Sequence, residues 1–240
     1  MRIAVISDIH GNLRALEAVV KDIQRRGADT VVNLGDSLSG PLLPKETAQF
    51  LMAQPWIHLA GNHERQILTL TANSGESDKY AHSQLGALEL KWIESLPWVH
   101  QLSPEVLLCH GTPASDCTSL LQTAERNATR SEIEARLGPV DVPVILCGHT
   151  HVPRIVRAWS NTLIVNPGSA GQPGFADDYP HPHVIESGSP DARYAMVEKV
   201  EGRWLASLHC VPYAYREMAS LAKSRARPDW ESALLGGYMS

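Results

Sequence analysis

Seven polar side chains stand just beyond short apolar runs in this sequence of 240 residues, and a glycine lies next to the polar residues at the end of every run. They are Asp8 and His10 in SDIHGN, Asp36 in LGD, Asn62 in GNHE, His110 in CHG, and His149 and His151 in CGHTH. Carboxylate, amide and imidazole groups without a thiolate suit Mn, Fe, Zn, Ni or Co, and the set is too rich in histidine for a Mg or Ca site. The chemistry favoured by these residues is transition-metal binding.

The number of these candidate ligands points to two metal ions. Seven ligands exceed the needs of one cation, and two cations could share the Asp36 carboxylate as a bridge. Two divalent ions would supply a charge of about +4, from which Asp8, Asp36 and a bridging hydroxide remove about three. The neutral amide of Asn62 preserves the surplus. A positive surplus favours a phosphate oxyanion, the typical substrate of sites whose two metals lie ~3.5–4 Å apart.

A rigid frame must position these side chains, and the sequence predicts a frame of β-strands. Five apolar strands are expected at residues 2–7, 29–34, 56–60, 105–110 and 142–147. Ligands bind beyond the carboxyl ends of strands in open α/β sheets, so the five strand ends should converge. Because residues i and i+2 of extended backbone point to one side, Asp8 should lie with His10, and His149 with His151.

The remaining elements complete a mixed α/β chain. Apolar spacings of three and four predict a helix from Leu13, capped by Asn12 and ended by Gly27. Further helices are expected at 44–52, 82–96, 124–137 and, as one or two closing helices, 213–237. Strands are expected at 154–159, 162–165, 194–200 and 203–211, with a Gly/Pro-rich loop at 166–183. One domain over 1–240 is predicted, in which 1–151 carries the ligand motifs and 152–240 adds the strands of a second sheet and the closing helices.

Composition excludes several classes of protein. The formal net charge is −5, which argues against a protein that coats nucleic acid or a membrane surface. No apolar run reaches about 18 residues, so no membrane span is expected. The four cysteines form no CxxC pair, and Cys109 and Cys147 lie in apolar runs as core residues. We expect a cytoplasmic protein, whose oligomeric state the sequence leaves open.

The sequence resembles the calcineurin-like metallophosphoesterase family, in a compact bacterial form. The motifs that carry the resemblance are D-x-H-G at 8–11, G-D at 35–36, G-N-H-E at 61–64, H-G at 110–111 and G-H-T-H at 148–151, with NPGS at 166–169. Their order is the order of the family. The resemblance implies an α/β fold of four layers, an α-β-β-α sandwich of two mixed sheets, with a binuclear site at the sheet edge.

The resemblance also implies a role for each residue. Asp8, His10, Asp36 and His151 match the ligands of the first metal, and Asp36, Asn62, His110 and His149 match those of the second. His63 matches the histidine that hydrogen-bonds the phosphate or protonates the leaving oxygen, a catalytic role worth roughly 10²–10⁴-fold. The implied reaction is in-line attack on phosphorus by a metal-bridging hydroxide, without a covalent enzyme intermediate. Of the candidate metals, Mn is favoured.

One departure from the family narrows the function. Related protein phosphatases and diadenosine-tetraphosphate hydrolases grip the phosphate with an arginine, where the segment GDSLSGP has Gly40. This departure argues against protein-phosphatase activity. The expected function is that of a phosphodiesterase acting on small substrates, nucleotides among them. The alternatives are a phosphomonoesterase or nucleotide pyrophosphohydrolase, which His63 keeps chemically open, and a non-catalytic scaffold that binds proteins. Substrate choice is expected to depend on loops 37–47, 65–82, 112–130 and 171–190, the last of which contains His181 and His183.

Overall fold

Two five-stranded sheets form the centre of the computed structural model, which describes residues 1–178 and 181–239. The first sheet contains, in spatial order, β12 (Arg203–Val211), β11 (Ala192–Val200), β1 (Arg2–Ile6), β2 (Thr30–Asn33) and β3 (Ile57–His58). The second contains β4 (Val99–Ser103), β5 (Val106–Cys109), β6 (Val144–Leu146), β8 (Leu163–Asn166) and β7 (Arg154–Arg157). Both sheets are mixed: β1, β2 and β3 run parallel, as do β5, β6 and β8, while their outer neighbours run antiparallel.

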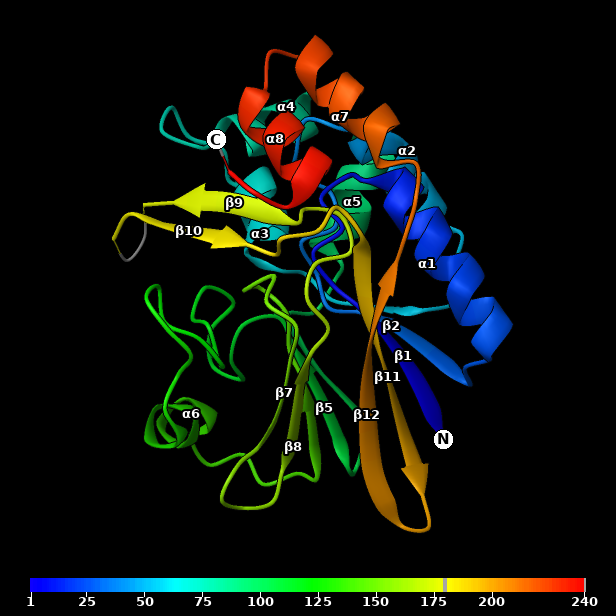
Figure 1. The fold of residues 1–240 in the computed structure, drawn as a ribbon, viewed down its shortest axis with the longest axis vertical. Coiled ribbons are helices and arrows are strands. Elements are labelled where there is room, and N and C mark those ends of the chain that lie inside the picture. Colours follow the sequence, from blue (N-terminus) through cyan, green and yellow to red (C-terminus); the bar gives the residue numbers. More distant parts are fainter. Residues whose placement is uncertain (179–180, 240) are drawn as a thin grey trace.

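Alternating apolar residues explain why the two sheets stack. Ile3 and Val5 of β1 face the second sheet and share one core with Val106 and Val144. Their neighbours on β1 face the other way, against the apolar stripe of helix α1 (Leu13–Arg26), which includes Leu16. On the second sheet the outward residues pack against α6 (Arg130–Leu137). Figure 1 shows the resulting order of helix, sheet, sheet and helix, which confirms the predicted four-layer α-β-β-α sandwich.

Further helices cover the end of the sandwich that carries the candidate ligands (Figure 1). They are α2 (Pro44–Met52), α3 (Asn62–Leu68), α4 (Glu76–Gln84), α5 (Ala87–Glu94), α7 (Tyr215–Ser224) and α8 (Pro228–Gly236). A two-stranded hairpin of β9 (Gly174–Asp177) and β10 (His183–Glu186) projects from the same end. No helix in the described part of the chain is both long and apolar enough to span a bilayer.

Several predicted elements differ from the structure. The single helix expected at 82–96 is two helices, because the chain bends at Gly86, whose N–H donates to the Glu89 carboxylate at 2.9 Å. The helix expected at 124–137 begins only at Arg130, after the capping hydroxyl of Thr129. The strands after residue 151 divide between the two sheets instead of all joining the second. The loop expected at 166–183 contains β9 and leads into β10, and its residues 179–180 lie outside the described part.

Candidate metal centre

Six of the predicted ligands lie in the loops beyond the strands, and Asn62 is the first residue of α3. Five of the loop ligands have left-handed backbone. The φ angle is 56° at Asp8, 52° at His10, 53° at Asp36, 70° at His149 and 58° at His151. Strand β1 ends at Ile6 and β6 at Leu146, so none of these residues continues an extended chain. The expected extended backbone with i, i+2 alternation is therefore wrong. Asp8 and His10 do lie in one group of ligands, but His149 and His151 belong to different groups.

Cross-loop hydrogen bonds hold this unusual backbone. A left-handed conformation costs a non-glycine residue about 1–3 kcal/mol, which the surrounding structure must outweigh. The Asp8 N–H donates to the carbonyl of Gly35 at 3.0 Å, and the His10 N–H donates to the carbonyl of Asp36 at 3.0 Å. A glycine beside a ligand allows close approach: a Cβ on Gly61 would lie 2.2 Å from Oδ1 of Asp36. The loops after β1, β2 and β3 thus fix one another.

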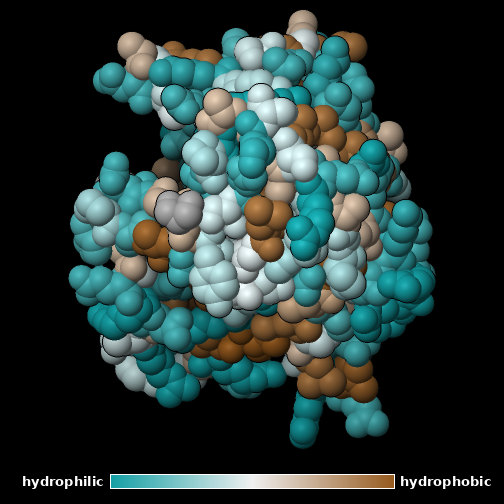
Figure 2. All heavy atoms as spheres, turned by 45° about the horizontal axis from the view of Figure 1, so that its top comes forward, coloured by the Kyte–Doolittle hydropathy of each residue, from teal (hydrophilic) through white to brown (hydrophobic). Residues whose placement is uncertain are grey.

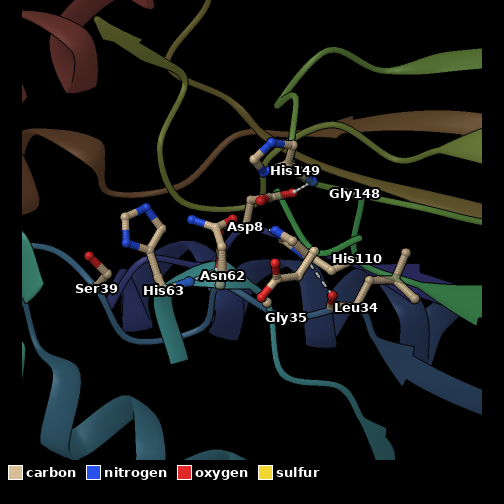
Figure 3. Close-up of polar contacts among 12 residues, drawn as sticks. Asp8, Leu34, Gly35, Ser39, Asn62, His63, His110, Gly148 and His149 are labelled. Atoms are coloured by element: carbon tan, nitrogen blue, oxygen red, sulfur yellow. Dashed lines mark hydrogen bonds and ion pairs between the residues drawn. The ribbon is translucent and has the colours of Figure 1, made fainter. Parts of the chain in front are cut away.

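Six of the seven predicted ligands form two groups. Asp8, His10 and His151 make the first group, and Asp36, His110 and His149 make the second; within each, one ligand atom per residue lies within 4.8 Å of the others. In the first group the Nε2 atoms of His10 and His151 are 3.1 Å apart. In the second, Nε2 of His110 lies 3.1 Å from Oδ2 of Asp36. Figure 3 shows Asp8, Asn62, His110 and His149 gathered around one space, so the seventh residue also reaches the centre.

Each histidine of the two groups is oriented by a backbone carbonyl. Nδ1 of His10 bonds the carbonyl of Ser39 at 2.8 Å, and Nδ1 of His110 bonds that of Leu34 at 2.9 Å. Nδ1 of His151 bonds the carbonyl of Gln172 at 2.8 Å, whereas His149 uses Nε2 toward Cys117 at 3.0 Å. A carbonyl only accepts, so the bonded nitrogen carries the proton and the other nitrogen presents a lone pair. This arrangement is typical of metal-binding histidines.

Burial and charge determine the protonation of these groups. Burial, assisted by the neighbouring His151, lowers the pKa of His10 to about 3. Burial and the neighbouring His110 lower the pKa of His149 to about 4. At His110 burial also lowers the pKa, but the Asp36 carboxylate outweighs it and raises the pKa to about 10. The raised pKa means that Nε2 of His110 also carries a proton, which faces Asp36. A bound cation would replace this proton, since metal ligands must lose their protons.

The residues present fit metal ions. Oδ1 of Asn62 is buried without a hydrogen-bond partner among residues 1–178 and 181–239. Oδ1 of Asp8 and Nε2 of His110 are buried with one ion-pair contact each, to Nε2 of His151 at 3.4 Å and to Oδ2 of Asp36 at 3.1 Å. Buried polar atoms in folded proteins are almost always paired, so incompletely satisfied atoms gathered in one space require an explanation. A cation bound by nitrogen and oxygen atoms provides it, and the absence of a thiolate fits a transition metal.

Comparison with known proteins identifies the family. A family model described as the calcineurin-like phosphoesterase superfamily domain matches residues 1–186. The chain belongs to this superfamily. A metallophosphoesterase from Sphaerobacter thermophilus is 27% identical, covers 99% of this chain and 100% of its own, and has a TM-score of 0.78. An uncharacterized protein from Methanocaldococcus jannaschii is 27% identical over 207 residues, which are 71% of this chain and 76% of the relative.

A second solved structure supports the fold alone. The hypothetical protein of Pyrococcus horikoshii OT3 is 18% identical, with a TM-score of 0.78 over 100% of this chain and 99% of its own. Superfamily members hydrolyse phosphoester bonds and depend on metals, so the chain is a metal-dependent phosphoesterase. The family, the fold and the enzyme class expected from the sequence are confirmed.

In this phosphoesterase, Glu64 positions the loop that carries Asp36. Its carboxylate is fully buried and accepts three backbone N–H groups, from Asp36 at 2.8 Å, Ser37 at 2.8 Å and Gly61 at 2.7 Å. These contacts give Glu64 a hydrogen-bonding role at the N-terminus of α3. Glu64 therefore ties the loop after β2 to the start of α3.

His63 projects into the same cleft with a partner that the sequence did not reveal. Nδ1 of His63 lies 2.8 Å from Oδ1 of Asp78, a buried residue of α4. Burial lowers the pKa of His63, but the carboxylates of Asp36 and Asp78 outweigh it and raise the pKa to about 9. The Nδ1 proton faces Asp78, which leaves Nε2 for the substrate. Asp78 lies in no recognised motif, and only the fold of α4 against α3 brings it here.

Gly40 stands where related phosphatases have their arginine, and the structure shows what fills that space. A Cβ on Gly40 would lie 2.7 Å from Cη2 of Trp230 and 2.8 Å from the carbonyl oxygen of His10. Trp230 belongs to α8, is buried, and its ring centroid lies 6.1 Å from that of His10. The sequence did not predict that the closing helix reaches the centre. The indole ring of Trp230 therefore occupies the space that a side chain at position 40 would need to reach the centre.

A cleft of about 1330 Å³ opens above the two groups. Residues from all four loops expected to choose the substrate line it, among them Ser39, Thr71, Thr118 and Phe175. In Figure 2, which turns this end forward, the surface is largely hydrophilic, with a notch at the left edge. One side of the cleft is formed by the β9–β10 hairpin and another by the loop at 117–126. The two sides approach each other where Nε2 of His181, just before β10, lies 3.7 Å from Oε1 of Glu125.

Proposed function

We propose that this phosphoesterase hydrolyses small phosphodiesters, nucleotides among them, at a centre of two divalent transition-metal ions, with Mn favoured. The observation that carries the proposal is the pair of neighbouring ligand groups, beside which the acceptor Oδ1 of Asn62 is buried with no hydrogen-bond partner among the described residues. Asp8, His10 and His151 would hold one ion, and Asn62, His110 and His149 the other. Asp36 would bridge the two.

When bound, the two ions supply the charge that polarises the phosphoryl oxygens and lowers the pKa of a coordinated water. The side chains of the protein have three other tasks. Glu64 holds the Asp36 loop in place through three backbone N–H groups. Asp78 fixes the orientation and the tautomer of His63. His63 then presents Nε2–H to a phosphoryl oxygen or to the leaving oxygen as it departs.

The charge of the cleft favours a diester over a monoester. A diester carries one negative charge and a monoester up to two, so a monoester needs more positive charge around it. The guanidinium groups that line the cleft are already engaged: Arg126 pairs with Glu132, and Arg227 pairs with Asp229 at 2.6 Å. The third, Arg136, donates to the backbone carbonyls of Ser119, Leu120 and Gln122. Trp230 blocks a further arginine at position 40.

The same features argue against polymeric substrates. Six acidic side chains stand among the described cleft-lining residues beside the three arginines: Asp36, Glu76, Asp78, Glu125, Asp177 and Asp229. A nucleic-acid strand needs a continuous basic surface, whereas one small phosphoester does not. The cytoplasmic location expected from the sequence stays a prediction, and so does the single-domain organisation.

A phosphomonoesterase is the second candidate, favoured by the His63–Asp78 pair, which can protonate a poor leaving group. Purified protein loaded with Mn should hydrolyse bis(p-nitrophenyl) phosphate faster than p-nitrophenyl phosphate. Hydrolysis of the monoester alone would overturn the diesterase proposal. Inactivity of the fully loaded protein across diesters, monoesters and pyrophosphates would instead favour a binding scaffold.

A further inference from the structure

One wall of the cleft presents an aromatic side chain next to the first ligand group. The ring of Phe175, on β9, lies with its centroid 4.6 Å from that of His151, at an interplanar angle of 61°. Phe175 is only half-buried and lines the cleft. An aromatic ring that is partly open to solvent within an active-site cleft offers a surface on which another ring can stack.

The hairpin register places a second ring on the same face. Phe175 pairs with Ile185, and His183 pairs with Asp177, so Phe175 and His183 are diagonal neighbours. Diagonal residues on one face of an antiparallel pair are within reach of each other. Their ring centroids are 6.3 Å apart at an angle of 77°, and His183 is also half-buried in the cleft. Phe175 and His183 form an aromatic corner that begins beside His151.

Support of His151 does not by itself account for Phe175. The carbonyl of Gln172 already orients the His151 ring through a bond of 2.8 Å to Nδ1. An aliphatic side chain at position 175 could also pack against that ring, although without the edge-to-face contact. The solvent-facing surface of the Phe175 ring has a role beyond packing on His151 only if a planar ligand group binds in the cleft.

We propose that Phe175 and His183 bind a planar ring of the substrate, a nucleobase joined through its sugar to the phosphate held at the centre. The proposal rests on the proposed function and narrows its substrate class to nucleotides. Stacking of a base on an aromatic side chain tolerates any base, because every base has a π-face. The corner therefore selects for a base without selecting which one.

Binding calorimetry with two ligands tests the proposal on the full chain loaded with Mn. Adenosine monophosphate and a ribose phosphate esterified at the same oxygen differ only in the base. Adenosine monophosphate should bind about tenfold more tightly, which is within the effect of one stacked base. In Phe175→Leu that preference should fall to about twofold or less, while the affinity for ribose phosphate stays unchanged. Phe175→Tyr should restore the preference, and His183→Ala should reduce it in part.

Val184→Ala is the matched control, because Val184 lies on the same hairpin, is 52% exposed and is absent from the cleft lining. It should bind both ligands as the natural protein does. Equal affinity of the natural protein for the two ligands would overturn the proposal. A Phe175→Leu variant that weakens both ligands equally would also overturn it, because Phe175 would then act only through His151. Both ligands are monoesters, as the products of the proposed diesterase would be, so failure of the diesterase proposal would appear separately, in the hydrolysis assays.

Discussion

Replacing Glu64 with glutamine tests whether one buried carboxylate holds the Asp36 loop in position. Oε2 of Glu64 accepts the N–H groups of Asp36 and Gly61, and Oε1 accepts that of Ser37. A glutamine amide has one acceptor oxygen, and its NH₂ group must face at least one of these donors. At least one hydrogen bond is lost, and its N–H group is left buried without a partner.

The magnitude follows from that count. A hydrogen bond to a charged group contributes about 1.5–3 kcal/mol, and an orphaned buried donor costs about 1–3 kcal/mol. Burial and the neighbouring Asp36 raise the pKa of Glu64, so the cost of burying its charge offsets part of the gain from these bonds and favours the lower half of these ranges. We expect Glu64→Gln to lower the free energy of unfolding by about 2–4 kcal/mol. Because the Asp36 backbone loses its anchor, kcat for bis(p-nitrophenyl) phosphate should fall by at least tenfold, roughly the effect of a slight misplacement.

A control separates loss of stability from misplacement of Asp36. Glu89 is also buried and also caps a helix, accepting the Gly86 N–H at 2.9 Å and the Gln49 amide at 3.0 Å, but it belongs to α5 and does not line the cleft. Glu89→Gln should lose stability in urea unfolding and keep kcat. If Glu64→Gln unfolds at the same urea concentration as the natural protein and keeps its kcat, the reasoning about Glu64 is wrong.

Three further predictions concern the centre and the frame. Asp36→Ala should abolish diester hydrolysis and lower the metal content measured by mass spectrometry from two ions to one or fewer; retained hydrolysis would refute the bridging role. Asp78→Asn should leave His63 poorly oriented, so that kcat falls by about 10²-fold for an alkyl leaving group and much less for p-nitrophenol, and an equal loss for both would contradict the assigned role. Hydrogen bonds from Tyr194 and Arg26 outweigh burial and lower the pKa of Asp22, so this residue stabilises the fold above its unfolded pKa and the contribution is lost as pH falls through its folded pKa. Asp22→Asn should remove that part of the acid dependence in urea titrations at pH 3 to 6, and an unchanged dependence would count against it.

The sequence predicted which side chains gather at the strand ends better than it predicted the backbone geometry that gathers them. Residue type and position beyond each apolar run were enough to select Asp8, Asp36 and His110, because strand ends of a stacked sheet must meet at one edge. The left-handed backbone was not predictable from alternation, since it depends on hydrogen bonds between loops that are distant in sequence. Asp78 was missed for a related reason: its meeting with His63 depends on how α4 packs on α3.

The hairpin and the closing helix show a second limit of sequence patterns. Gly174 and the prolines around Phe175 indicate a loop when only local propensity is considered, yet the segment pairs as β9 and β10 once α8 packs against it. Trp230 carried no functional signal, because an aromatic residue in an amphipathic helix is usually a core residue. Only the close approach at Gly40 gives it a place beside the centre. Tertiary contacts decided these elements.

The left-handed backbone also explains how so few segments can supply two ligand groups. In extended backbone, His149 and His151 would point to one side and serve one ion. With φ of 70° and 58°, the chain turns at each of them, and the two rings enter different groups. Asp8 and His10 turn in the same way, yet stay together because the His149 N–H donates to Oδ2 of Asp8 at 3.2 Å and His151 lies against Oδ1 at 3.4 Å. Asp8 is thus held by residues 149–151, the segment whose two histidines belong to different ligand groups. Any change that straightens this segment should therefore disturb both groups at once.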